Sequence, residues 1–149
     1  MNAVIKAILV DDEESARNVL SNLLHRHFPQ IKIVGKCANV VDAVEVIKKQ
    51  QPDVVFLDIE MPNYTGYEIV KFFDDINFEI IFVTAYNKYA IKAFEVSALD
   101  YLLKPIEIPR LKEAVKKLEE KIDLADQKTK YKLLTEALKT KSVQQIYIS

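Results

Sequence analysis

Val54-Val55-Phe56-Leu57-Asp58 joins four consecutive apolar residues to an aspartate near the middle of this 149-residue chain, and the predicted fold follows from this run. A β-strand points successive side chains to opposite faces of its sheet, so four consecutive apolar residues make both faces of the strand apolar. Such a strand lies in the middle of a sheet that helices cover on both sides. Ile80-Ile81-Phe82-Val83 repeats the pattern and predicts a second covered strand.

Three further strands are predicted on either side of these two, over residues 4–10, 31–37 and 99–103. Helical spacing of apolar residues separates the strands, over residues 16–24, 42–50, 67–73 and 89–96, and a last helix begins near Leu111. Strand and helix thus alternate five times, a pattern typical of parallel strands joined by right-handed helical crossovers. We predict an α/β fold: a flavodoxin-like, doubly wound, five-stranded parallel sheet with five helices, the last one extended. Ligands of such folds bind at the carboxyl ends of the strands.

The composition excludes several classes of protein. Half of the residues are hydrophobic and 29% are charged, which is the balance of a soluble globular domain. Apolar runs reach only four residues, whereas a membrane span needs roughly 20, so we expect no membrane partner. No export signal is recognisable at the N-terminus. Cys37 is the only cysteine, which excludes an internal disulfide and a cysteine-built zinc site and favours a cytoplasmic location.

The net charge of −1 is the sum of an acidic N-terminal part and a basic C-terminal part. Residues 1–103 carry 10 Lys and Arg against 15 Asp and Glu, whereas residues 104–149 carry 11 against 7. The acidic part argues against direct DNA binding, because contacts to phosphates require a basic surface. The basic excess near the C-terminus lies along a predicted helix. A solvated helix face is its default interpretation, and contact with nucleic acid is the alternative.

The end of the chain predicts further organisation. The last helix is expected to run on to about residue 139, and residues 145–148 have the pattern of a strand that has no partner in the sequence. Apolar residues early in this helix follow 4-3-4-3 spacing, which is typical of a short coiled-coil seam: Leu111, Val115, Leu118, Ile122 and Ala125. We therefore predict one domain over residues 1–125, a helical linker over 126–142 and the start of a truncated output domain over 143–149.

Carboxylates follow two of the predicted strands. Asp11 and Asp12 come directly after strand 4–10, and Asp58 directly follows strand 54–57. If these strands are neighbours, three carboxylates meet at one edge of the sheet and repel one another. Mg²⁺ resolves such repulsion, because it prefers carboxylate oxygens and water as ligands. The alternative is that acidic residues cap the following helices, which accounts for Asp12 or Glu13 alone but not readily for three aspartates at two strand ends.

Two other strand ends carry groups that suit an anion. Thr84 follows strand 80–83, and Lys104 follows strand 99–103. A hydroxyl and an ammonium at this edge can hold the oxygens of a phosphoryl group. The alternatives are a strand-end residue for Thr84 and a solvated basic residue for Lys104. A cis peptide between Lys104 and Pro105, uncommon among X-Pro bonds, would turn the lysine inward.

The ordered set of Asp-Asp, Asp, Thr-Ala and Lys-Pro after strands one, three, four and five resembles the receiver domain of two-component response regulators. The resemblance covers about residues 5–125. It implies that Asp58 accepts a phosphoryl group from a histidine kinase. It also implies that Asp11 and Asp12, together with Asp58, bind Mg²⁺, and that Thr84 and Lys104 contact the phosphate.

The same resemblance assigns roles to three more residues. The backbone carbonyl of Glu60 would complete the metal site, and Gly66 matches a glycine in the loop after the phosphorylated strand. Tyr101 matches an aromatic switch residue that fills the space opened when Thr84 moves toward the phosphate. Phosphorylation would then rearrange the face formed by the fourth helix, the fifth strand and the fifth helix. On this interpretation the chain is a signalling switch, not an enzyme, whose only chemistry is its own phosphotransfer and dephosphorylation.

Residues 94–105 further resemble receivers that precede LytTR-type DNA-binding domains. This implies transcription regulation, with DNA contacted only through an output domain that is missing from this chain. We also expect a homodimer through the face of helices four and five, extended by the 111–125 seam. A stand-alone receiver that signals through protein contacts is the alternative.

Two rivals come from other functional classes. An aspartate-nucleophile phosphatase of haloacid-dehalogenase type uses Asp-X-Asp at one strand end, whereas Glu60 lies two residues after Asp58 here. A flavin-binding module would need a Ser-, Thr- or Gly-rich loop after the first strand. The acidic Asp11-Asp12-Glu13 stretch at that position would repel a flavin phosphate.

Overall fold

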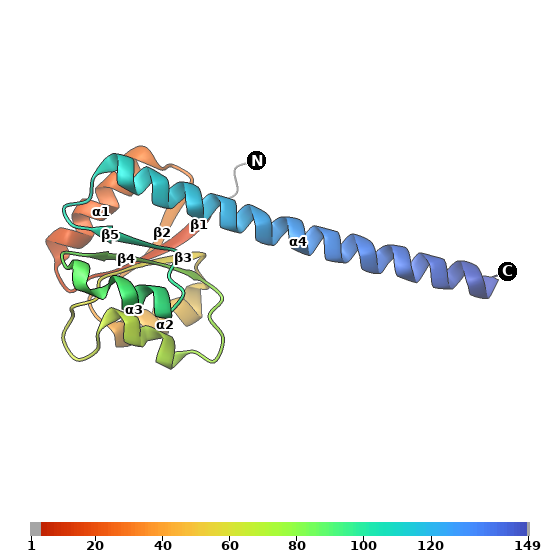
Figure 1. Ribbon diagram of the computed structural model, residues 1–149, viewed down its shortest axis with the longest axis horizontal. Helices are drawn as coiled ribbons and strands as arrows, with labels where there is room; N and C mark the ends of the chain where they lie inside the picture. The colour runs from red at the N-terminus through yellow and green to blue at the C-terminus, as the bar shows by residue number, and fades with distance from the viewer. Residues whose placement is uncertain (1–3, 149) are drawn as a thin grey trace. The chain divides into compact units, whose positions relative to one another are not determined.

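The computed structural model describes the backbone of residues 4–148 and the side chains of residues 4–140. Its sheet has five strands, all parallel, in the order β2-β1-β3-β4-β5 (Figure 1). The strands are β1 (Ile5–Val10), β2 (Ile31–Cys37), β3 (Val54–Leu57), β4 (Glu79–Thr84) and β5 (Asp100–Leu103). The predicted doubly wound α/β fold is therefore confirmed.

Helical segments follow each strand, as predicted. They are α1 (Glu14–His27), α2 (Val40–Gln50), η1 (Gly66–Phe72), η2 (Asn87–Tyr89) continuing into α3 (Ala90–Glu95), and α4 (Ile108–Ile148). The third predicted helix, η1, is a 3₁₀ helix. Its seven residues begin with a glycine, and 3₁₀ geometry is typical of such short segments.

The predicted strand over residues 145–148 is wrong, because these residues belong to α4. A helix satisfies its backbone hydrogen bonds within itself, whereas a strand needs a neighbour to receive them. In the described chain, the sheet consists of β1 to β5, and residues 145–148 pair with none of these strands. Whether residues 143–149 begin an output domain stays a prediction.

Both faces of the sheet are buried. Apolar side chains of alternate strand positions, among them Val55, Leu57 and Phe82, pack with residues of α2, η1 and α3 in one core cluster. The intervening positions, such as Phe56, are also buried, and α1 and the first turns of α4 cover that side (Figure 1). Cys37 lies in the core as expected, where burial raises the pKa of its thiol to about 11.

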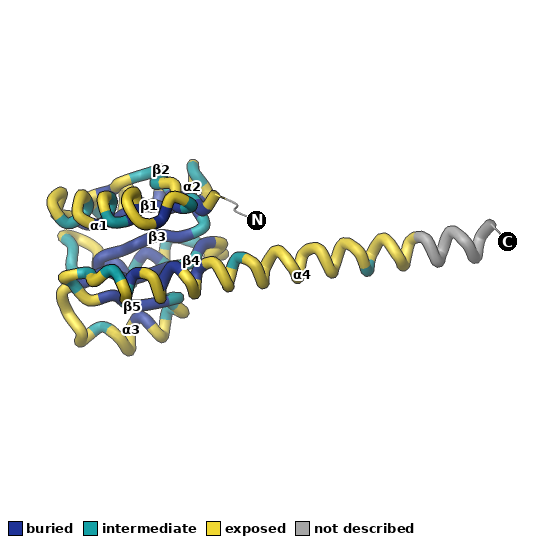
Figure 2. The backbone as a smooth tube through the Cα atoms, turned by 90° about the horizontal axis from the view of Figure 1, so that it is seen from above, coloured by how far each residue is buried: buried dark blue, intermediate teal, exposed yellow. Residues whose placement is uncertain are grey.

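The chain divides into two compact units, residues 1–114 and 115–149. Within the first unit, the Arg110 guanidinium ties the start of α4 to β5 by donating to both carboxylate oxygens of Asp100, at 2.6 and 2.9 Å. The second unit consists of the rest of α4, whose side chains up to residue 140 are mostly exposed (Figure 2). Among the described residues, no helix combines the length and apolar character needed to cross a bilayer.

The covered sheet predicts unequal responses to two phenylalanine truncations. Phe56 in β3 is 1% exposed, whereas Phe94 in α3 is 84% exposed. We expect Phe56→Ala to lower the free energy of unfolding by about 3–5 kcal/mol, because it leaves a cavity between packed layers. Phe94→Ala should change it by less than about 0.5 kcal/mol. Urea unfolding followed by circular dichroism measures both, and equal losses would contradict this account of the core.

Candidate functional site

Parallel pairing brings four strand ends to one edge of the sheet. Val10 at the end of β1 is in register with Leu57 at the end of β3, so Asp11 and Asp58 leave the sheet side by side. The Asp58 amide donates to the Val10 carbonyl at 2.9 Å, which extends this pairing by one residue. At β4 and β5, the Lys104 amide donates to the Thr84 carbonyl at 2.8 Å.

Three carboxylates meet at this edge. Asp11, Asp12 and Asp58 each place one carboxylate oxygen within 4.8 Å of the others. Asp11 and Asp58 are buried, whereas Asp12 is exposed. This donor set fits a hard divalent cation such as Mg²⁺, which takes one or two carboxylates and completes its shell with water.

The geometry gives little support to the helix-capping alternative. Glu13 is the N-cap of α1, and its side chain makes no capping hydrogen bond. One oxygen of Asp11 accepts from the Glu13 amide at 2.9 Å, which shapes the turn into α1. The other oxygen of Asp11 faces the site, so this residue serves both the turn and the carboxylate cluster.

Lys104 reaches into the cluster from β5. Its Nζ lies 2.7 Å from Oδ2 of Asp11 and 3.0 Å from Oδ2 of Asp58, and its side chain is 23% exposed. The peptide between Lys104 and Pro105 is cis. Lys104 is therefore not the solvated surface lysine of the alternative interpretation, but a cation held between two buried carboxylates.

Burial and charge act in opposite directions on these groups. Burial raises the pKa of the Asp58 carboxyl, and the hydrogen bond and charge of Lys104 offset only part of that increase. Burial also opposes the charge of Lys104, but the hydrogen bonds to Asp11 and Asp58 prevail and raise the pKa of its ammonium. The lysine stays protonated beside a carboxylate that is poorly compensated, an arrangement that favours binding of a further cation.

Thr84 and Tyr101 both contact the backbone of Tyr86. The Thr84 side chain is fully buried, and its Oγ1 accepts from the Tyr86 amide at 3.4 Å. Tyr101 is partly buried beside Phe82, and its hydroxyl donates to the Tyr86 carbonyl. The loop after β4 thus connects the two residues that the family resemblance assigns to the switch.

A tyrosine cluster surrounds Glu60, and sequence reasoning did not predict it. The Glu60 carboxylate accepts from the Tyr89 hydroxyl at 2.5 Å and lies 3.6 Å from the Lys88 ammonium. The ring of Tyr89 also contacts those of Tyr67 and Tyr86. The hydrogen bond from Tyr89 lowers the pKa of Glu60. Only the abundance of tyrosines near the predicted edge pointed here, because no spacing rule links Glu60 to Tyr89. The metal-ligand role of the Glu60 carbonyl stays a prediction.

Gly66 lies directly against the backbone of Asp58. A Cβ atom at position 66 would lie only 2.0 Å from the carbonyl oxygen of Asp58, and the Gly66 amide donates to the Ile59 carbonyl at 2.8 Å. A side chain of any size at this position would push the loop away from the strand end. The glycine therefore permits the close approach that shapes the wall of the site.

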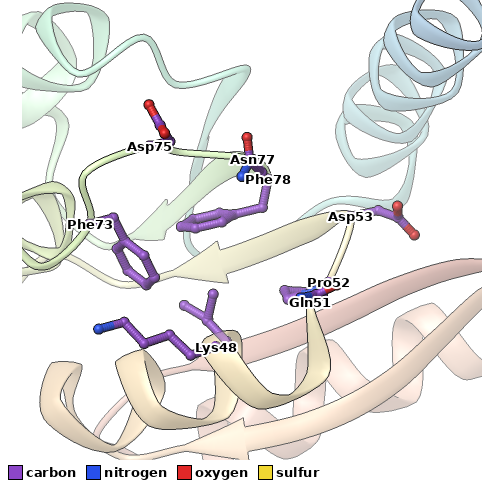
Figure 3. Close-up of a pocket in the computed structure, with 9 residues that line it drawn as sticks. Lys48, Gln51, Pro52, Asp53, Phe73, Asp75, Asn77 and Phe78 are labelled. Carbon is purple, nitrogen blue, oxygen red and sulfur yellow. The ribbon is translucent and has the colours of Figure 1, made fainter. Parts of the chain in front are cut away.

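A separate cavity lies at the other end of the strands, away from every predicted site residue (Figure 3). Its volume is about 410 Å³, and it opens where α2 ends and where β3 and β4 begin. Phe73 and Phe78 form part of its wall, and the Lys48 ammonium lies over the Phe73 ring. None of the carboxylates that meet at the carboxyl edge lines this cavity.

The sequence of this chain matches a known protein family and resembles named relatives. The family model of the response regulator receiver domain matches residues 7–116. The chain is 50% identical over 116 residues to the transcriptional regulatory protein BtsR of Salmonella typhi, and 46% identical over the same length to BtsR of Escherichia coli K12. Each match covers 77% of this chain but 48% of the relative, so the chain spans about half the length of these regulators.

Solved structures of other response regulators share the fold of this chain. The response regulatory domain of mrkE from Klebsiella pneumoniae is 32% identical, with a TM-score of 0.73 over 80% of this chain and 99% of that domain. The REC domain of AraT from Geobacillus stearothermophilus is 28% identical, with a TM-score of 0.74 over 83% of this chain and 98% of that one.

The close approach of Gly66 to Asp58 predicts a strong effect of a single methyl group. We expect Gly66→Ala to lower the free energy of unfolding by about 1–3 kcal/mol, because the obstructing atom belongs to the backbone and cannot rotate away. Gly35→Ala is the matched control: its Cβ would lie 2.7 Å from a Val46 side-chain carbon, which can move. Chemical unfolding of both variants tests this, and a larger loss for Gly35→Ala would contradict it.

Proposed function

Because this chain belongs to the response regulator receiver domain family of two-component systems, we propose that Asp58 accepts a phosphoryl group from a histidine kinase. The observation that carries the proposal is the meeting of Asp11, Asp12, Asp58 and Lys104 at one sheet edge. Such an arrangement offers a nucleophilic carboxylate next to positive charge, with room for a metal among three oxygens.

The proposed reaction transfers a phosphoryl group from a phosphorylated histidine of the kinase to the unphosphorylated Asp58 side chain. An Asp58 carboxylate oxygen attacks the phosphorus of the kinase phosphohistidine, so an O–P bond forms and the N–P bond breaks. The histidine nitrogen keeps the bonding electron pair and takes up a proton. Lys104 is already within hydrogen-bond distance of Asp58, so its ammonium is well placed to bind a phosphoryl oxygen after transfer.

Asp11, Asp12 and Asp58 are the residues that would hold Mg²⁺, together with the Glu60 carbonyl that the resemblance assigns. When bound, the ion neutralises charge between the carboxylates and the phosphoryl oxygens. The fit rests on the oxygen-only donor set and on the mutual spacing of the three carboxylates.

The signal would leave the site through Thr84 and Tyr101. A new phosphoryl group adds charge and acceptor oxygens that attract the Thr84 hydroxyl. Because Thr84 and Tyr101 are both hydrogen-bonded to the Tyr86 backbone, movement of one alters the contacts of the other. The proposed output is a rearranged surface over α3, β5 and the start of α4.

The proposed output is control of transcription. Related proteins are named transcriptional regulators, and their match to this chain covers only 48% of their length, which leaves room for an output domain. We propose a LytTR-type DNA-binding domain for that part, so that this chain itself contacts no DNA. A stand-alone receiver acting through protein contacts is the second candidate. We also propose a cytoplasmic location for the chain, which the single cysteine favours.

Turnover of a small phosphorylated substrate is the weaker alternative. A phosphatase of the haloacid-dehalogenase type needs a free carboxylate two residues after its nucleophile. Here that residue is Glu60, whose carboxylate is occupied by Tyr89 and lies near Lys88. We therefore propose a switch that performs only its own phosphotransfer and dephosphorylation.

The proposal predicts a specific loss of phosphorylation. Asp58→Asn should abolish labelling by acetyl phosphate with Mg²⁺ while leaving the fold intact, because an amide oxygen is a far weaker nucleophile than a carboxylate. Intact mass spectrometry measures the added phosphoryl group, and circular dichroism checks the fold. Asp75→Asn, at an exposed position away from the site, should label like the unchanged chain. Stoichiometric labelling of Asp58→Asn would refute the assignment.

We also propose that the phosphorylated chain forms a homodimer through the face of α3, β5 and the start of α4. The predicted 111–125 seam is not proposed to extend it, because Leu111, Val115 and Leu118 are buried. Ile91 and Phe94 on α3 are 75% and 84% exposed, and Leu103 on β5 is 45% exposed. Large apolar side chains that are exposed on neighbouring elements are typical of protein interfaces.

This interface predicts a selective effect of Phe94→Ser. With beryllofluoride and Mg²⁺ present, we expect this variant to dissociate at concentrations about tenfold higher than those that dissociate the unchanged chain, because an aromatic anchor is lost. Val19→Ser is the control, since Val19 on α1 is 56% exposed but lies off this face. Sedimentation velocity reports the oligomeric state. A phosphorylated-like chain that remains monomeric at high concentration would contradict the dimer.

A further inference from the structure

The distal part of α4 exposes an apolar stripe that no contact within the described chain covers. Leu124, Tyr131, Leu134 and Leu138 are between 55% and 73% exposed. Their spacing of seven, three and four residues places all four on one side of a helix with 3.6 residues per turn. Aligned apolar side chains do not stabilise a helix that is surrounded by water. A continuous exposed apolar stripe is instead typical of a surface that binds a partner.

The stripe has the heptad pattern of a helix that pairs with another helix. With Leu124 at position a, Tyr131 and Leu138 also occupy a positions, and Leu134 occupies d. The remaining d position within the stripe is Gln127, whose amide both donates and accepts hydrogen bonds. A polar residue inside an apolar seam is typical of coiled coils that must adopt a single register.

The charges beside the stripe indicate which partner it fits. Asp123 occupies position g and Lys128 the following e position, and both are exposed. In a parallel pair of identical helices, position g of one helix faces the next e position of the other. Asp123 of each copy would then face Lys128 of the other, and this attraction occurs twice by symmetry. An antiparallel pair places g beside g and e beside e, so the same attraction does not form.

We propose that the 124–138 stripe is a self-association surface, on which α4 of a second copy of this chain packs in parallel. Gln127 then meets its own counterpart, and the Asp123–Lys128 pairs flank the seam. This surface is distinct from the α3 and β5 face, and it operates without phosphorylation because none of its residues belongs to the site around Asp58. Two heptads make a weak pair, so association depends on concentration and is strengthened wherever another contact already joins two copies.

Two neighbouring leucines provide the decisive comparison. Leu134 lies in the stripe, whereas Leu133 is 61% exposed and points to the opposite side of the helix. Sedimentation equilibrium of the unphosphorylated 149-residue chain should show self-association that Leu134→Lys weakens about tenfold or more, since a buried leucine is replaced by a charge. Leu133→Lys should leave the association unchanged. An unchanged chain that stays monomeric, or equal effects of the two variants, would overturn the proposal.

Charge reversal and cross-linking test the parallel arrangement separately. Asp123→Lys and Lys128→Asp should each weaken association, and the double reversal should restore it. In a Cys37→Ser background, oxidation should join two Leu124→Cys chains into a disulfide dimer, while Leu133→Cys chains stay separate. Failure of the double reversal to restore association, or absence of the Leu124→Cys dimer, would exclude the parallel pair.

A last comparison distinguishes the two proposed surfaces. Phe94→Ser should leave the association of the unphosphorylated chain unchanged, because the stripe acts without the α3 face. If Phe94→Ser abolishes this association and Leu134→Lys does not, the chain pairs through α3 and β5 alone and the helix proposal is wrong. The phosphorylation of Asp58 is unaffected by either outcome, so the proposed function stands or falls on its own test.

Discussion

The parallel register between β1, β3, β4 and β5 is the constraint on which the whole site depends. It aligns Val10 with Leu57, so Asp11 and Asp58 emerge together, and it places Lys104 against the end of β4. Backbone hydrogen bonds within a covered sheet are costly to break, because no water is available to replace them. Four short stretches that lie up to 93 residues apart are therefore held within hydrogen-bond distance by the sheet alone.

The sheet also imposes an electrostatic cost that makes the site responsive. Asp11 and Asp58 are buried with one partly buried lysine between them, and burial still raises the pKa of Asp58. Buried paired charges are only partly compensated by each other. A bound cation or phosphoryl group therefore changes the net charge and the electrostatic energy of the site strongly. Thr84 and Tyr101 are connected to this edge through the Tyr86 backbone, so the same electrostatic change has a path to the surface.

The two surfaces that we propose for contact with a second copy of the chain differ in physical character. On α3 and β5, the large apolar side chains of Ile91, Phe94 and Leu103 are exposed. Along α4, the exposed leucines follow a heptad repeat with complementary charges beside it. The first surface is suited to respond to chemistry at Asp58, whereas the second depends only on helix geometry. A receiver with both can keep two copies close together and still change how they contact each other.

The pattern of apolar residues along the sequence predicted the fold, because the apolar runs at Val54–Leu57 and in β4 indicate covered strands that alternate with helices. The acidic residues after the first and third strands indicated the edge that carries the site. The sequence also indicated Thr84 and Lys104, since strand ends of a parallel sheet share that edge. Residues 145–148 were misassigned because strand-like residues form a strand only where a neighbour exists. The contacts of Glu60 with Tyr89, and of Gly66 with Asp58, were decided by tertiary structure. Local patterns determine which face a residue occupies, but only the packed loops determine which side chains touch across them.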